Sequence, residues 1–165
     1  MEKPYRPFFL TAAIILLDQL TKWLIVSLVP YHTVARSFGG DFLRIIHTRN
    51  LAVAFSLGNG FPQPVKLFLF ILVPLIALVA ISVYLVKGRD LSSFQRWVLA
   101  AIVGGGAGNI IDRIFRPEGV VDFIDVKFYG LFGLDRWPTF NVADSTVVVA
   151  GIALLISFFL EERKQ

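Results

Sequence analysis

Four long apolar stretches are the feature of this sequence that most restricts its fold. They cover residues 8–29, 67–86, 97–114 and 142–160. Each has about 18 to 22 residues, the length that an α-helix rising about 1.5 Å per residue needs to cross roughly 30 Å of hydrocarbon. With 56% hydrophobic and 17% charged residues, the chain is too apolar for an ordinary soluble domain. The sequence predicts four transmembrane helices in one integral membrane domain, residues 1–165.

Lysine and arginine positions set the expected orientation. The two termini and the short loop after the second stretch carry seven of these cations, and the long connections, about residues 30–66 and 115–141, also carry seven. Cations in short loops near helix ends weigh most and mark the cytoplasmic side. We therefore expect cytoplasmic termini and long connections on the outer side. The net charge of +4 suits anionic lipid and does not indicate nucleic acid as a partner.

Several kinds of site are disfavoured by composition. The chain has no cysteine, which removes thiol catalysis, disulfides and thiolate metal sites. His32 and His47 lack the spacing of a helical metal pair, and we interpret them as ordinary polar or interfacial residues. No metal or cofactor is expected.

The long connections have strand character. Residues 42–49 and 51–56 of the first connection and residues 120–128 of the second are rich in β-branched and aromatic residues, and glycines separate the segments. We expect a small sheet on the outer membrane surface. Pro74 lies within the second stretch and is expected to kink that helix.

The first stretch carries the polar run D-Q-L-T-K, residues 18–22. This stretch is longer than the core of a cleavable signal peptide and contains Asp18 and Lys22, so we expect a permanent helix. Asp18 and Lys22 are four residues apart, so they share a helix face and can pair. A structural ion pair and a direct role in function both remain open, although pairing would make Lys22 a poor base.

The third stretch ends in G-G-G-A-G-N-I-I-D-R, residues 104–113. Gly105, Gly108, Asn109 and Asp112 recur on one helix face, which therefore faces a partner helix or a cavity. For the glycines, close helix packing is the favoured explanation. An ion pair between Asp112 and Arg113 at the helix end is a plausible structural role for both, but it leaves Asn109 unexplained.

Alternation along residues 120–128 separates two aspartates. In a strand, Asp122 shares a face with the aliphatic residues, whereas Asp125 shares the other face with Lys127. We expect Asp125 in a solvated ion pair and Asp122 in a place of low polarity.

Asp144 opens the fourth stretch. Asn141 can be the helix N-cap, which places Asp144 at the third helical position of a capping box. Asp112, Asp122 and Asp144 are nevertheless expected at a similar depth. Two close carboxyls share one proton, so one can deprotonate water while the other hydrogen-bonds the carbonyl that the water attacks.

Five motifs, taken in order, resemble the lipoprotein signal peptidases, or signal peptidase II. They are D-Q-L-T-K, N-L-A-V-A-F-S, G-N-I-I-D-R, V-V-D-F-I and F-N-V-A-D-S, which begin at residues 18, 50, 108, 120 and 140. Each motif alone is weak, but together they span nearly the whole chain. The resemblance implies an all-α membrane protein with four transmembrane helices and a small extramembrane β-cradle, located in the bacterial inner membrane.

The resemblance also implies an activity and a set of site residues. The expected enzyme is an aspartic endopeptidase that cuts prolipoproteins on the amino side of a diacylglyceryl-modified cysteine, with membrane lipids around it and as a monomer. The family's catalytic pair corresponds to Asp122 and Asp144. Its structural or substrate-positioning residues correspond to Asp18, Lys22, Asn50, Asn109, Asp112, Arg113 and Asn141. One departure is Ala52, where the family usually has glycine; the change affects the loop or its fit to substrate if that glycine permits an unusual backbone angle.

Three alternatives remain open on the residues alone. An ion or proton transporter could use Asp18, Lys22, Asp112 and Arg113 as a relay. A serine protease could pair Lys22 with Ser145 or Ser56. A divalent cation could bind the oxygens of Asp122, Asp144 and Asn141.

Overall fold

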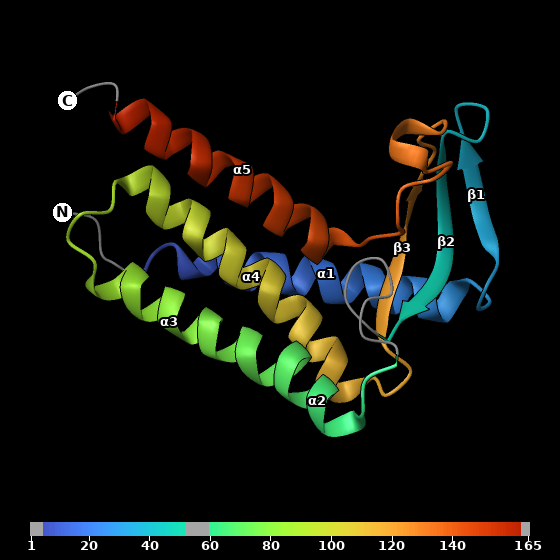
Figure 1. Ribbon diagram of the computed structural model, residues 1–165, viewed down its shortest axis with the longest axis horizontal. Helices are drawn as coiled ribbons and strands as arrows, with labels where there is room; N and C mark the ends of the chain where they lie inside the picture. The colour runs from blue at the N-terminus through green and yellow to red at the C-terminus, as the bar shows by residue number, and fades with distance from the viewer. Residues whose placement is uncertain (1–4, 52–59, 163–165) are drawn as a thin grey trace.

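Four long apolar helices lie side by side with a small sheet across one end (Figure 1). This computed structural model describes residues 5–51 and 60–162. Within them, the segments long and apolar enough to cross a membrane are Phe8–Leu28, Gln63–Lys87, Ser93–Phe115 and Val142–Glu161. The first, third and fourth correspond to α1 (Phe8–Leu28), α4 (Ser93–Phe115) and α5 (Val142–Glu162). The expectation of four membrane-spanning helices is confirmed.

The second span begins earlier than predicted and contains a wider turn. It consists of α2 (Gln63–Leu67), a π-helical segment (Phe68–Leu72) and α3 (Val73–Lys87). Pro74 lies in the first turn of α3, directly after the π-helical turns. Proline has no N–H and its ring crowds the preceding turn. The π-helical turns before Pro74 give this ring more room, in the region where the sequence predicted a kink.

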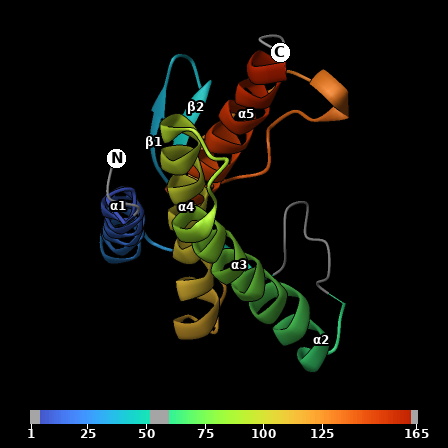
Figure 2. The same ribbon diagram turned by 90° about the vertical axis from the view of Figure 1, so that its left-hand side faces the viewer.

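Helix α4 is the central element of the bundle. It packs against α1, α3 and α5, and Figure 2 shows it between α1 on one side and α3 and α5 on the other. Its glycines permit this close packing. A Cβ atom added to Gly105 would lie 2.6 Å from the carbonyl oxygen of Ala143 in α5, and one on Gly108 would lie 2.6 Å from a carboxylate oxygen of Asp18 in α1.

The Gly105→Ala variant is expected to destabilise the protein by about 1–3 kcal/mol, because its Cβ atom would meet a backbone oxygen that cannot rotate away. The matched variant is Gly151→Ala in α5, where an added Cβ atom meets nothing within 4 Å. That variant should be neutral or stabilising by up to about 1 kcal/mol. Unfolding in mixed detergent micelles measures both; equal stabilities for the two variants would contradict this account.

The sheet has three antiparallel strands in the order β1 (Val34–Phe38), β2 (Leu43–Asn50) and β3 (Val120–Val126). The predicted strands at 42–49 and 120–128 are confirmed with small shifts. The prediction missed β1, whose residues are all exposed and show no alternation. Positions 52–59, including Ala52 and Ser56, lie outside the described residues, as does most of the predicted strand at 51–56.

A small apolar cluster joins the sheet to the helices. Val121 and Phe123 of β3 pack with Ile25 and Val29 at the end of α1. His47 of β2 is buried beside them, and its ring Nδ1 lies 2.8 Å from the carbonyl oxygen of Val29. The apolar cluster and this contact hold β3 and β2 against the end of α1.

The solvated ion pair predicted for Asp125 and Lys127 is wrong. Asp125 is only 2% exposed, and its carboxylate accepts hydrogen bonds at 2.7 Å from the Nε atoms of Arg44 and Arg136. Arg44 is the cross-strand partner of Asp125 in the sheet, a relation that alternation along one strand does not reveal. The Lys127 ammonium lies over the ring of Tyr129 instead.

Candidate active site

The predicted polar residues gather where the ends of α1, α4 and α5 meet the sheet. Hydrogen bonds and ion pairs connect Asp18, Lys22, Asn109, Asp112, Asp122, Asn141 and Asp144 into one network. Asn50, the last residue of β2, joins this network through a side-chain hydrogen bond to Asp122. These residues are far apart in the sequence, and the fold brings them together.

The start of α5 forms the predicted capping box. The side-chain oxygen of Asn141 accepts a hydrogen bond from the Asp144 N–H at 2.9 Å, and the Asn141 N–H donates to Asp144 Oδ2 at 3.2 Å. The other carboxylate oxygen of Asp144 accepts from Asn109 Nδ2 at 2.7 Å. Asp144 is therefore a helix cap that also has a partner on α4, which capping alone does not require.

Asp122 is the second carboxylate of the site. It is 3% exposed, and its Oδ1 accepts a hydrogen bond from Asn141 Nδ2 at 2.7 Å. Burial raises the pKa of Asp122 to about 7, and the negative charge of Asp144 adds to this effect. The prediction that Asp122 lies in a place of low polarity agrees with this burial.

Hydrogen-bond chemistry fixes the orientation of both asparagine amides. Asn109 Oδ1 lies 2.9 Å from the Lys22 ammonium, which can only donate, so the Asn109 NH₂ group faces Asp144. Asn141 Oδ1 accepts from a backbone N–H, so its NH₂ group faces Asp122. Each carboxylate thus receives a hydrogen bond from an amide.

The predicted ion pair between Asp18 and Lys22 is confirmed and extended. Both side chains are fully buried, and Lys22 Nζ lies 2.8 Å from Asp18 and 3.1 Å from Asp112. With Asn109, three acceptors use the three ammonium protons. Lys22 is therefore unavailable as a base, and the Ser145 hydroxyl donates to the Asn141 carbonyl oxygen, so the geometry disfavours a Ser145/Lys22 protease.

Asp112 pairs with residues other than the predicted Arg113. Its carboxylate contacts Lys22, Arg116 and the backbone N–H of Val121. Arg116 follows Asp112 by four residues, a spacing that sequence reasoning could have used. Gln19, also missed, donates to Asp112 and to Asp18.

Arg113 is the predicted site residue that stands apart from the hydrogen-bond network. Its charge interacts most strongly with Asp144, and then with Asp122 and Asp112. It makes no hydrogen bond or ion pair within the described ranges 5–51 and 60–162. A half-buried guanidinium beside two carboxylates suits a role in binding a carbonyl oxygen.

The geometry also bears on the metal alternative. Asn141 Oδ1 is already used by the α5 cap, which disfavours it as a cation ligand. Among residues 5–51 and 60–162, no three histidine or acidic side chains are grouped so as to hold a metal ion.

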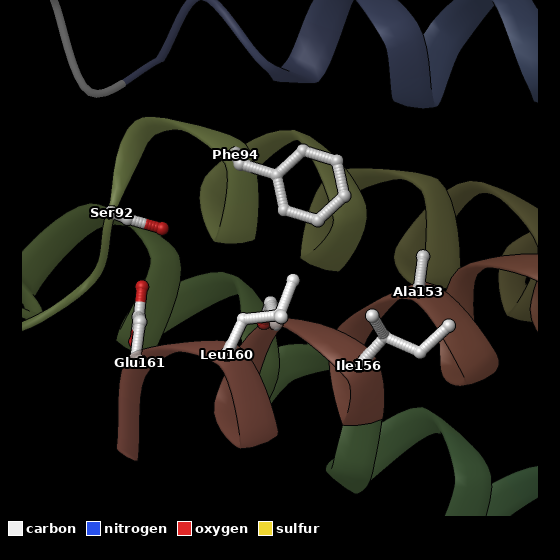
Figure 3. A pocket seen from close by; sticks show the side chains of 7 residues that line it. Ser92, Phe94, Ala153, Ile156, Leu160 and Glu161 are labelled. Carbon is white, nitrogen blue, oxygen red and sulfur yellow. The ribbon is translucent and has the colours of Figure 1, made fainter. Parts of the chain in front are cut away.

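A separate hollow lies at the far end of α4 and α5, away from the two aspartates (Figure 3). Its walls are mostly apolar side chains, among them Phe94, Ile156 and Leu160, with Ser92 and Glu161 at its edge. It shares no lining residue with the network around Asp122 and Asp144, and we assign it no part in the site.

Comparisons with known proteins point to one family. The family model described as "Signal peptidase (SPase) II" matches residues 10–160. The chain is 45% identical to the lipoprotein signal peptidase of Treponema denticola, over 98% of this chain and 92% of that protein. It is 42% identical to that of Treponema pallidum, over 96% and 85%. A solved structure described as a bacterial membrane enzyme superposes with a TM-score of 0.82 at 27% identity, over 96% of this chain and 90% of that one.

Proposed function

The chain belongs to the signal peptidase II family of membrane aspartic endopeptidases, which cleave signal peptides from prolipoproteins, and from this premise we propose that Asp122 and Asp144 are its catalytic pair. The observation that carries the proposal is their link through Asn141, which donates to Asp122 and caps the helix turn that holds Asp144. One side chain thereby places two carboxylates from different elements beside each other.

The environments of the two carboxyls support different roles. Asp144 accepts hydrogen bonds from the Asn109 amide and from a backbone N–H, and both of these groups can only donate to it. Asp122 is buried, which favours its protonated form. We therefore assign Asp144 as the base and Asp122 as the acid.

The reaction then follows as peptide hydrolysis without a metal. Asp144 takes a proton from water, and the water oxygen bonds to the scissile carbonyl carbon while Asp122 donates its proton to the carbonyl oxygen. When the C–N bond breaks, the proton held by Asp144 passes to the leaving amine, and Asp122 regains its proton from the tetrahedral intermediate. Arg113 orients the substrate carbonyl beside the pair.

The substrate is a prolipoprotein whose cysteine carries diacylglycerol, cut on the amino side of that cysteine. The lipid stays in the outer leaflet of the inner membrane while the scissile bond reaches the aspartates at the sheet end of the bundle. In this arrangement the sheet and the active site face the periplasm and both termini face the cytoplasm. The protein acts as a single-domain monomer among membrane lipids.

Cleavage of a lipidated prolipoprotein by the purified protein in detergent tests this function. Mass spectrometry should give the diacylglyceryl cysteine as the new N-terminal residue, and a chelator should leave the rate unchanged. Equal rates on lipidated and unlipidated precursor would contradict the proposal that the enzyme recognises the diacylglyceryl group. Loss of activity in chelator would contradict a mechanism without a metal ion.

The rate of cleavage should fall as the pH rises through about 7, because Asp122 acts as an acid and burial raises its pKa to that value. Above this pH, kcat/KM should drop about tenfold per pH unit, since one proton is lost. The measurement is a pH–rate profile in detergent, with melting temperatures at each pH to exclude unfolding. A rate that stays constant to pH 9 would contradict the assignment of Asp122 as the acid.

A further inference from the structure

The turn of residues 128–134, between β3 and α5, exposes apolar side chains outside the membrane spans. Its sequence is F-Y-G-L-F-G-L. Tyr129 is 68% exposed, Leu131 54% and Phe132 83%, and among the described residues no other large apolar side chain is as exposed as Phe132. Adjacent exposed apolar side chains, unlike single ones, indicate a surface that contacts a protein or a membrane.

The backbone of the 128–134 turn has a defined and costly shape. Tyr129 and Phe132 have φ angles of 52° and 53°, in the left-handed region that side chains other than glycine rarely adopt. Hydrogen bonds close the turn, from the Gly130 N–H to the Leu134 carbonyl oxygen at 2.9 Å and from the Gly133 N–H to that of Gly130 at 3.0 Å. A simple connection between two elements does not require two aromatic residues in this conformation.

The base of the turn is fixed to the sheet. The ring of Trp137 packs against that of Phe128, with 4.9 Å between their centres, and the Trp137 N–H donates to the carbonyl oxygen of Val126 at 2.9 Å. Arg136 Nε donates to the buried carboxylate of Asp125 at 2.7 Å. The position of the 128–134 turn relative to the bundle is therefore set by contacts with β3.

Figures 1 and 2 place the 128–134 turn at the sheet end and outside the bundle. In Figure 1 it belongs to the orange segment next to the start of α5. Figure 2 looks along the helices from the other end, and there the same segment extends sideways past α5. Because the helices cross the membrane, a segment that extends sideways at their sheet end lies over the lipids beside α5.

Lipid suits this turn better than a protein partner. Three exposed side chains cannot alone provide the roughly 1,000 Å² that a stable protein interface buries, whereas aromatic and aliphatic side chains often contact a membrane at headgroup level. The ammonium of Lys127 lies 5.4 Å from the centre of the Tyr129 ring. A cation therefore lies beside the apolar group, where anionic lipid headgroups attract it.

We propose that the 128–134 turn docks on the lipid surface beside α5, with Leu131 and Phe132 at the boundary between headgroups and acyl chains. The partner is the lipid of the bilayer itself, because the turn extends away from the bundle. The proposal depends on the membrane-spanning helices and not on the catalytic pair.

Site-directed spin labelling measures the depth of this turn in a bilayer. The chain has no cysteine, so Leu131→Cys and Phe132→Cys each give one labelling site in the full-length protein. The labelled proteins are placed in nanodiscs of phosphatidylcholine with a minor share of phosphatidylglycerol, without prolipoprotein. Collisions of the label with oxygen, which dissolves in lipid, are compared with collisions with a nickel chelate, which stays in water.

Two further labelling sites provide the controls. Ser37→Cys is the matched control, because Ser37 is exposed on the edge strand β1, which Figure 1 shows farthest from the helices. Leu155→Cys, on an exposed position of the α5 span, gives the signal of a label within the hydrocarbon. A thermal melt of each variant verifies that it is folded.

The labels at positions 131 and 132 are expected about 5–10 Å below the lipid phosphates, the depth that interfacial apolar side chains reach. The label at position 37 is expected in water. The double variant Leu131→Cys/Phe132→Ser should move the label at position 131 toward water, because the turn loses its most exposed apolar side chain.

The proposal is overturned if the labels at positions 131 and 132 meet the nickel chelate as often as the label at position 37. It is also overturned if neither reagent reaches them, since protein, such as a second copy of the chain, would then cover the turn. An unchanged depth at position 131 in the double variant would contradict the insertion of Phe132. None of these measurements involves cleavage, so failure of the catalytic assignment would leave them unaffected.

Discussion

Replacing Asp122 or Asp144 with asparagine is expected to reduce prolipoprotein cleavage by about 10³-fold or more while the protein stays folded. Asparagine has nearly the shape of aspartate but can neither take a proton from water nor give one to a carbonyl oxygen. At position 144 the amide oxygen can still accept the hydrogen bond that closes the capping box. The substitution therefore separates catalysis from helix capping.

The measurement is a gel-shift assay of prolipoprotein cleavage in detergent with chelator present, together with a thermal melt of each variant. Asp125→Asn is the matched control, because Asp125 is a buried aspartate of the same strand whose partners are Arg44 and Arg136. It should lower stability and keep turnover. If Asp144→Asn cleaved normally but melted at a lower temperature, Asp144 would be only a cap, and the catalytic pair would lie elsewhere.

Replacing Asp112 with alanine is expected to destabilise the protein by about 3–5 kcal/mol, the usual effect of removing one partner from a buried ion pair. Lys22 would lose one of its two carboxylates, and the Val121 N–H would lose its acceptor. Because Arg116 also pairs with Asp112, the variant leaves two cations without a shared anion near the helix end.

Unfolding by sodium dodecyl sulfate in mixed micelles measures this difference. The control is Glu118→Ala, which removes an exposed partner of Arg49 and should change stability by no more than about 1 kcal/mol. Similar stabilities for the two variants would show that the buried ion pairs of Asp112 with Lys22 and Arg116 contribute little to the free energy of unfolding. A stable Asp112→Ala variant without activity would instead indicate that Asp112 has a direct role in the reaction.

Local features of this protein were predictable from the sequence because their physical causes are local. Span lengths follow from the thickness of hydrocarbon that an apolar helix must cross, so the helices were located to within a few residues. The Asn141–Asp144 capping box and the Asp18–Lys22 pair join residues three and four positions apart, which any helix brings together. The order of short motifs was enough to indicate the family.

Contacts across the fold were decided only by the tertiary structure. The partner of Asp125 depends on the register of β2 and β3, so alternation within one strand placed Asp125 in solvent when it is buried. The hydrogen bond between Asp18 and the Ala143 N–H joins residues 125 positions apart, and it requires α4 glycines that let α1 and α5 approach. Such contacts cannot be predicted from spacing along the sequence. They form when packing excludes water, and each buried polar group then pairs with the groups that the fold places next to it.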